Sequence, residues 1–350
     1  MASRFIGAGL LALALAACQG ENGQVASAAR DQIRVVGSST VYPFTTAVAE
    51  QFVRRAPQFK PPVVESTGTG AGVKLFCSGV GTKFPDIVNA SRRMKKSEYD
   101  NCAANGVKNV IEVQVGVDGL VFAESLRAEA IPLTREDIYK ALAAKPFGKD
   151  QTAKTWKDVN PALPAIAIRV YGPPPTSGTR DSLTELVMTP GCDSDPAMKA
   201  LKSSNEDQHK DLCTRIREDG AYVEAGENDN LIVQKVEANP GSIGAFGFSF
   251  LEENTDKVRG VRLNGVEPTY ETVSSFEYPG ARPLYIYVKG EHLAAIPGLK
   301  EFVAEYAQES SWGPQGYLAR RGLVAAPDAI RTLNAEVATK LTPLDPAGLH

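Results

Sequence analysis

The run from Pro175 to Ser182 concentrates groups that could bind an anion. It reads Pro-Thr-Ser-Gly-Thr-Arg-Asp-Ser and stands just before a helical pattern, in which Leu183, Leu186 and Val187 recur at spacings of three and four. The first N–H groups of a helix have no partner within the helix and lie at the positive end of its macrodipole. Hydroxyls, a glycine and a guanidinium at such a helix start predict an oxyanion-binding turn.

Four more segments place polar residues between a strand-like run and a helix-like run. They are 37–40 after strand 33–36, 67–72 after strand 63–66, 91–93 after strand 86–90, and 227–230, where Asn230 would cap a helix over 231–238. The Ser177 turn itself follows a predicted strand over 166–171. A single Ser or Thr before a helix is most often only a cap. The repetition, together with Arg92 and Arg180, favours a cleft at the carboxyl ends of parallel strands.

The elements that would position these turns have clear patterns. Phe44, Val48 and Phe52 recur every four residues after Pro43, as in an amphipathic helix with proline in its first turn. Residues 112–118 alternate as a strand does. Residues 299–306 have the pattern of an amphipathic helix, with Leu299, Phe302, Val303 and Tyr306 on one face.

Length and composition indicate a globular protein. The 350 residues suffice for two α/β lobes, and the chain is 43% hydrophobic and 23% charged. The formal net charge of −3 argues against a nucleic-acid partner, which would require a basic surface. Any bound anion would therefore be held by local donors rather than by the overall field.

The first 18 residues have the pattern of an export signal. Arg4 precedes an apolar stretch over 5–17, too short to span a bilayer, and Leu15-Ala16-Ala17-Cys18 is similar to a bacterial lipobox. We expect Cys18 to become the lipidated first residue, with 19–30 as a tether, giving a periplasmic protein anchored to a bacterial membrane by lipid. An ordinary signal peptide with a chance cysteine is the alternative.

Four cysteines remain in the exported part of the chain. Short separations favour disulfides between Cys77 and Cys102 and between Cys192 and Cys213, although four cysteines allow three pairings. A metal site is not indicated, because there is no Cys-x-x-Cys and the chain has only three histidines. No cofactor is expected.

Several motifs together carry a family resemblance over about residues 31–320. They are Gly37-Ser38-Ser39-Thr40-Val41-Tyr42-Pro43, Ser91-Arg92, Ser177-Gly178-Thr179-Arg180 and Asn239-Pro240-Gly241-Ser242-Ile243-Gly244. In this order they resemble the phosphate-binding proteins of high-affinity ABC phosphate transporters. The resemblance implies an α/β, two-lobed type II periplasmic-binding-protein fold with two crossing strands as the hinge. The crossings would lie near 112–118 and 282–288, so that 31–117 and 281–350 form one lobe and 118–280 the other.

The resemblance also implies a set of ligand residues. Carried over position by position, the phosphate-binding residues are Ser39, Thr40, Val41, Thr69, Gly70, Ser91, Arg92, Ser177, Gly178, Thr179 and Arg180. The sequence departs from the best-known relatives in two places, with Pro173 where they have an arginine and Arg92 where they have an aspartate. The carboxylate that accepts the proton of phosphate is therefore open between Asp118, which we favour, and Asp181.

The expected function is capture of inorganic phosphate for an ABC permease in the inner membrane, by a monomer without enzymatic activity. A receptor for sulfate or molybdate, or a phosphate sensor or scavenger, remains a related alternative. A phosphatase using Ser177 is disfavoured, since no histidine stands in a recognisable triad order. A P-loop at 68–74 fails because Val73, not glycine, precedes Lys74 and Leu75 follows it.

Overall fold

The computed structural model describes residues 30–226 and 229–350. The predicted signal peptide, Cys18 and the tether up to residue 29 lie outside the described residues, so their roles stay predictions. Within the described residues, no helix is both long enough and apolar enough to cross a bilayer.

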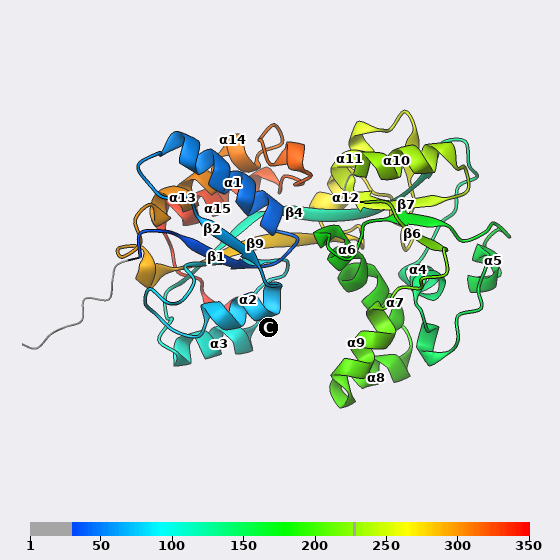
Figure 1. Cartoon of the computed structure of the whole chain (residues 1–350), viewed down its shortest axis with the longest axis horizontal. Helices are drawn as coiled ribbons and strands as arrows, with labels where there is room; N and C mark the ends of the chain where they lie inside the picture. The colour runs from blue at the N-terminus through cyan, green and yellow to red at the C-terminus, as the bar shows by residue number, and fades with distance from the viewer. Residues whose placement is uncertain (1–29, 227–228) are drawn as a thin grey trace, which may run out of the picture.

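Two lobes lie side by side, joined by the long strands β4 (Val110–Ser125) and β9 (Ala281–Lys289) (Figure 1). These strands pair antiparallel from Val110 opposite Lys289 to Gly119 opposite Ala281. β9 continues the sheet of lobe 1 through β3, and β4 continues that of lobe 2 through β7 and β8. Two crossing strands at the predicted places confirm the expected type II architecture.

Lobe 1 is built on three parallel strands, ordered β2-β1-β3. The strands are β1 (Arg34–Gly37), β2 (Val63–Ser66) and β3 (Ile87–Ala90), and the helices are α1 (Tyr42–Arg55), α2 (Thr69–Phe76), α3 (Lys96–Ala104), α13 (Leu299–Tyr306), α14 (Glu309–Trp312) and α15 (Asp328–Lys340). The buried face of α1, with Phe44, Val48 and Phe52, packs on Phe302 and Tyr306 of α13 in one hydrophobic core. The C-terminal part of the chain thus returns to lobe 1.

Lobe 2 also has parallel strands at its centre, ordered β7-β5-β6. Its strands are β5 (Val170–Gly172), β6 (Tyr222–Glu224), β7 (Ile243–Gly247) and β8 (Val258–Gly260), and its longer helices are α4 (Arg135–Leu142), α8 (Pro196–Ser204), α9 (Glu206–Thr214) and α10 (Asp229–Ala238). Shorter helices are α5 (Trp156–Val159), α6 (Gly178–Ser182), α7 (Thr189–Cys192), α11 (Phe248–Glu253) and α12 (Tyr270–Ser274). α10 begins at Asp229, so Asn230 lies inside the helix and does not cap it as predicted.

The helix after the Ser177 turn changes its winding. α6 runs directly into a π-helical segment, Leu183–Met188, which α7 continues. Leu183 and Val187 are fully buried in the lobe 2 core, as the spacing predicts, whereas Leu186 is only partly buried. π-helical turns are rare and often lie at functional sites.

Both predicted disulfides are present. Cys77 at the end of α2 is bonded to Cys102 in α3, and Cys192 at the end of α7 is bonded to Cys213 in α9. All four cysteines are fully buried. Each bridge fastens neighbouring helices within the hydrophobic core of one lobe and leaves the hinge strands free.

Candidate functional site

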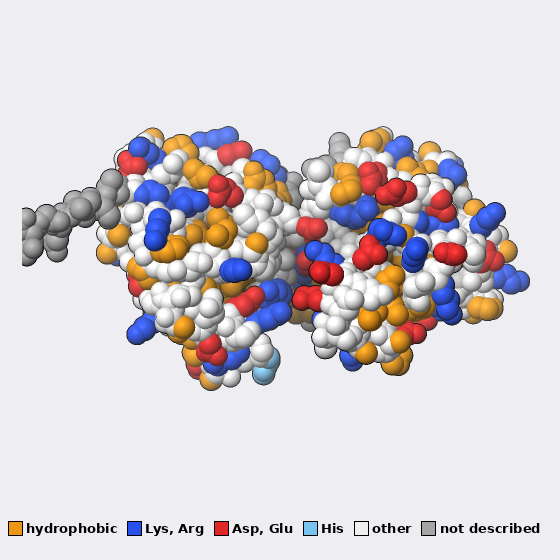
Figure 2. Space-filling view, turned by 60° about the horizontal axis from the view of Figure 1, so that its bottom comes forward, with side chains coloured by type: hydrophobic (Ala, Val, Ile, Leu, Met, Phe, Trp, Pro, Cys, Tyr) orange, Lys and Arg blue, Asp and Glu red, His pale blue; other side chains and the backbone are white. Residues whose placement is uncertain are grey.

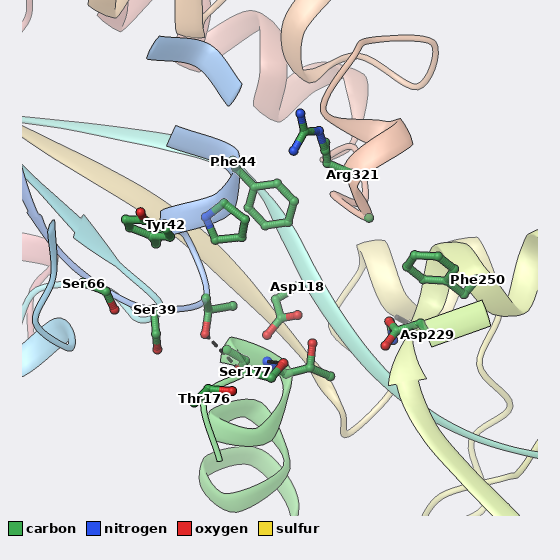
Figure 3. A pocket seen from close by; sticks show the side chains of 16 residues that line it. Ser39, Tyr42, Phe44, Ser66, Asp118, Thr176, Ser177, Asp229, Phe250 and Arg321 are labelled. Carbon is green, nitrogen blue, oxygen red and sulfur yellow. Dashed lines mark hydrogen bonds between the residues drawn. The ribbon is translucent and has the colours of Figure 1, made fainter. Parts of the chain in front are cut away.

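A cavity of about 440 Å³ lies between the lobes, beside the crossing strand β4 (Figure 3). Its wall in lobe 1 is the turn before α1, and its wall in lobe 2 is the turn before α6. Six predicted ligand residues line it: Ser39, Thr40, Asp118, Ser177, Gly178 and Thr179. Figure 2 shows that acidic and basic side chains gather along the groove between the lobes. The tertiary structure thus brings together turns separated by about 140 positions in the chain.

The two walls touch each other. The hydroxyl of Ser39 donates to the carboxylate of Asp181, and Thr40 Oγ1 donates to the carbonyl of Gly178 at 3.3 Å. A Cβ atom at Gly178 would lie 2.7 Å from the Cα of Thr40, closer than such atoms approach in proteins. Glycine at this position therefore allows the two lobes to meet.

Four other predicted ligand residues line a second cavity, of about 570 Å³: Thr69, Gly70, Ser91 and Arg92. Thr69 and Ser91 are bonded to each other, with their hydroxyl oxygens 3.0 Å apart and the N–H of Ser91 donating to Thr69 Oγ1 at 3.1 Å. Arg282 and Glu185 also line this cavity. Ten of the twelve predicted ligand residues are thus divided between two neighbouring hollows of the same groove, and Val41 and Arg180 line neither.

Arg92 is engaged within its own lobe. Its guanidinium donates to both carboxylate oxygens of Glu98, at 2.7 and 2.9 Å. This bidentate pair raises the pKa of Arg92 above its ordinary value, and the guanidinium stays charged. The pair fixes Arg92 at the rim of the second cavity.

Val41 and Ser177 have local roles at their helix starts. Val41 is fully buried, and its N–H points to the hydroxyl of Ser38 at 3.4 Å. Ser177 Oγ accepts from the N–H of Thr179 at 3.2 Å, as an N-cap does. Because a hydroxyl can accept and donate at once, Ser177 keeps its proton for a further acceptor.

Arg180 lies outside both cavities. Its guanidinium donates to the carbonyl of Pro173 at 3.0 Å, stacks over the ring of Tyr222 at 4.5 Å and lies 3.8 Å from Glu224. Burial raises the pKa of Tyr222 to about 12, and its hydroxyl donates to the same Pro173 carbonyl at 2.8 Å. In this arrangement Arg180 fastens the proline-rich turn behind α6.

Arg180→Ala is therefore expected to leave ligand affinity almost unchanged. A guanidinium that donated directly to an anion would account for about 2 kcal/mol, a loss of about thirtyfold on removal. Because Arg180 faces Tyr222, we expect a change in the dissociation constant of less than about threefold, measured by calorimetric titration. A thirtyfold loss would contradict this and place Arg180 in the site.

Arg282 is the arginine that sequence reasoning missed. It lies in β9, is 6% exposed, and makes four side-chain contacts. Nε donates to Asp118 Oδ2 at 3.1 Å, Nη2 donates to Thr40 Oγ1 and Ser182 Oγ at 2.9 Å each, and Nη1 pairs with Glu185. One signal was available, because Arg282 is the one charged residue within the predicted crossing strand 282–288. Arg282 connects the walls of the two cavities.

Asp118 sits at the centre of this arrangement, on β4. Its Oδ2 accepts from Ser182 Oγ at 2.6 Å as well as from Arg282. Its side chain, 14% exposed, lines the first cavity (Figure 3). The carboxylate is held by two donors while it faces the space that a ligand would occupy.

Asp229, in the first turn of α10, is a second acidic group in the first cavity, where it lies beside Phe250 (Figure 3). Its Oδ2 accepts from the N–H of Gly247 at 3.1 Å. Burial raises the pKa of Asp229 to about 6. The sequence offered no signal for it beyond its place in a strand-to-helix turn.

The raised pKa of Asp229 predicts a pH-dependent stability. The folded state holds the proton more strongly than the unfolded state, so this contribution is fully present below about pH 4 and is lost as the pH rises through about 6. Between pH 4.5 and 7.5 we expect the loss to be about 2 kcal/mol. Urea unfolding of the wild type and Asp229→Asn at both pH values measures it. If the free energies of unfolding of the two proteins differ by the same amount at both pH values, the prediction is contradicted.

Among the described residues, one group could supply three metal ligands: Asp193, His209 and Cys213. The sulfur of Cys213 is bonded to Cys192, so it cannot serve as a thiolate. His209 Nε2 and Asp193 Oδ1 are 2.7 Å apart and form a pair of their own. None of the three residues lines either cavity.

Two lobes, two crossing strands and a polar cleft between them define the class of two-lobed solute-binding proteins. Residues 22–310 match the PBP superfamily domain. The chain is 35% identical to "Protein SphX" of Synechococcus elongatus, over 82% of this chain and 76% of that protein. It is 32% identical to "Phosphate-binding protein PstS" of Staphylococcus saprophyticus, over 85% of this chain and 82% of that protein. The crystal structure of a possible phosphate-binding protein from Planctomyces limnophilus superposes with a TM-score of 0.69 at 28% identity, covering 88% of this chain and 98% of that one. The chain belongs to the PBP superfamily, in the family of the PstS and SphX proteins.

Proposed function

We propose that this protein captures inorganic phosphate between its lobes and delivers it to an ABC permease in the inner membrane. One observation carries the proposal: two hydroxyl-rich turns, Ser39–Thr40 before α1 and Ser177–Thr179 at α6, face each other across one cavity. The names of the PstS relatives and of the Planctomyces limnophilus structure specify phosphate for those proteins. Family and geometry therefore support the same ligand.

The mechanism is reversible capture. In an open form the hydroxyls of both turns are free to donate, and an anion that accepts from both draws the lobes together about β4 and β9. A hydrogen bond to a charged group contributes about 1.5–3 kcal/mol, so a handful of donors suffices for micromolar binding. Asp118 would accept the proton that phosphate still carries at neutral pH and would repel sulfate, which carries none.

No covalent step is needed for this function. None of the three histidines, all of which are among the described residues, lines the first cavity. His209 is paired with Asp193 and His292 with Asp86, each at 2.7 Å, so both have structural partners elsewhere. This supports a binding protein rather than a phosphatase.

Calorimetric titration of a chain lacking residues 1–29 with phosphate, sulfate and molybdate tests the proposal. We expect a dissociation constant for phosphate of about 1 μM or lower, and weaker binding of sulfate and molybdate. Preferential binding of either competitor would assign the site to another oxyanion. Hydrolysis of a phosphate monoester under the same conditions would favour the phosphatase alternative.

Residues 31–117 with 281–350 and residues 118–280 would be the two closing units. Each has its own main hydrophobic core, and Val117, Val324 and Ala326 of the first unit join the core of the second. Lipidation at Cys18 would hold the protein, as a monomer, at a bacterial membrane on its periplasmic side. Cell fractionation of Cys18→Ser tests the anchor, and we expect this variant to lose its association with the membrane.

A further inference from the structure

Two carboxylates of the helical segment after Ser177 reach toward lobe 1 and the hinge. Asp181 accepts from the hydroxyl of Ser39, and Glu185, four residues later, pairs with Arg282 of β9. The π-helical segment begins between them, at Leu183. Thr40 and Gly178 add a hydrogen bond between the lobes at 3.3 Å. Two of the three contacts thus place a negative charge of the protein itself against lobe 1 or the hinge.

We propose that Asp181 and Glu185 are internal anions that hold the lobes together without ligand, and that phosphate binding requires Asp181 to leave Ser39. This inference rests on the proposed function, because it assigns Ser39 to the ligand. It gives the two carboxylates the role of setting the affinity of the site. Asp181 then has a role different from that of an acceptor for the ligand proton.

The chemistry of Ser39 makes the two partners exclusive. A hydroxyl has one proton, so Ser39 can donate either to Asp181 or to a bound anion. A carboxylate left at this place would also repel a dianion. Phosphate binding must therefore break the bond between Ser39 and Asp181. Only molecules in which this bond is broken can bind, so the apparent affinity is proportional to their fraction.

Removal of Asp181 and removal of Glu185 should change the affinity by different amounts. The side chain of Glu185 is 57% exposed, and solvent weakens its attraction to Arg282. Arg282 also keeps its bonds to Asp118 and Thr40 when Glu185 swings away. Asp181 contacts a predicted ligand residue directly, and its removal should have the larger effect.

The test compares the full chain with Asp181→Asn and Glu185→Gln. Small-angle X-ray scattering without ligand reports opening of the lobes, and calorimetric titration with inorganic phosphate reports affinity. For Asp181→Asn we expect a larger radius of gyration without ligand and a dissociation constant about tenfold lower. For Glu185→Gln we expect the same direction and a change of about threefold. Glu218→Gln, an exposed position in lobe 2 with the same change in charge, should behave as the wild type.

Three results would overturn the inference. Weaker phosphate binding by Asp181→Asn would mean that this carboxylate contacts the ligand and assists it. Scattering and affinity equal to those of the wild type would mean that the contact with Ser39 holds nothing. If neither the wild type nor the variants bind phosphate, the proposed function fails. Unchanged scattering would then also show that the carboxylates do not hold the lobes together. A larger radius of gyration in Asp181→Asn would still support that part of the inference.

Discussion

Arg282→Met is expected to lower the free energy of unfolding by about 3 kcal/mol and to reduce phosphate affinity by more than tenfold. Methionine fills much of the same volume but leaves Asp118 without its cation, and removing one partner of a buried pair costs about 3–5 kcal/mol. Asp118 is partly exposed, so the lower end of this range applies. Thr40 and Ser182 lose a shared donor at the same time. Urea unfolding and calorimetric titration measure the two effects.

A double variant separates the orphaned charge from the lost contacts. In Arg282→Met with Asp118→Asn the buried carboxylate is gone, so stability should recover by about 1–2 kcal/mol relative to Arg282→Met alone. Arg282→Lys keeps the positive charge but not the planar set of guanidinium donors, so its stability should lie between those of the wild type and Arg282→Met. Equal stability of Arg282→Met and the wild type would show that the guanidinium does not compensate Asp118.

Asp118→Asn is expected to reduce the preference for phosphate over sulfate by about a hundredfold. The neutral amide accepts the phosphate proton less strongly and no longer repels a fully deprotonated dianion. Each effect should contribute about 1.5 kcal/mol, with phosphate binding weaker and sulfate binding tighter. Titration of the wild type and the variant with both anions at neutral pH gives the ratio directly.

Asp229→Asn is the matched control for this experiment, because it removes the other carboxylate of the same cavity. If Asp118 accepts the proton of the ligand, Asp229→Asn should retain most of the preference for phosphate over sulfate. Loss of the preference in Asp229→Asn alone would transfer the role to that residue. Unchanged discrimination in both variants would leave Asp181 as the acceptor.

Local pattern was sufficient for individual helices and strands, and the family resemblance implied how they assemble into two lobes. The spacing of Phe44, Val48 and Phe52 predicts α1, and the alternation around Val115 predicts a strand, because helices and strands bury side chains at fixed intervals. The resemblance implied that this strand crosses between the lobes. Short sequence separations also predict both disulfides. The strand over 166–171 was predicted too long, since only Val170–Gly172 pairs in the sheet.

The directions of long polar side chains were not predictable in the same way. Arg92 and Arg180 stand in the predicted turns, yet they bond to Glu98 and to Pro173 and Tyr222, while Arg282 of the hinge strand reaches Asp118. An arginine side chain can reach several partners, and the choice depends on which carboxylates and carbonyls the fold brings near.

The sequence by itself determined the helix starts and the family motifs, because these depend on residues close together in the chain, and the family resemblance implied the two crossing strands. Only the tertiary structure decided how the predicted ligand residues are shared between two cavities and that Asp229 lies beside them. It also decided that Asp181 bonds to Ser39 across the lobes. Such contacts join residues more than a hundred positions apart, and their partners are set by the packing of the lobes rather than by any local pattern.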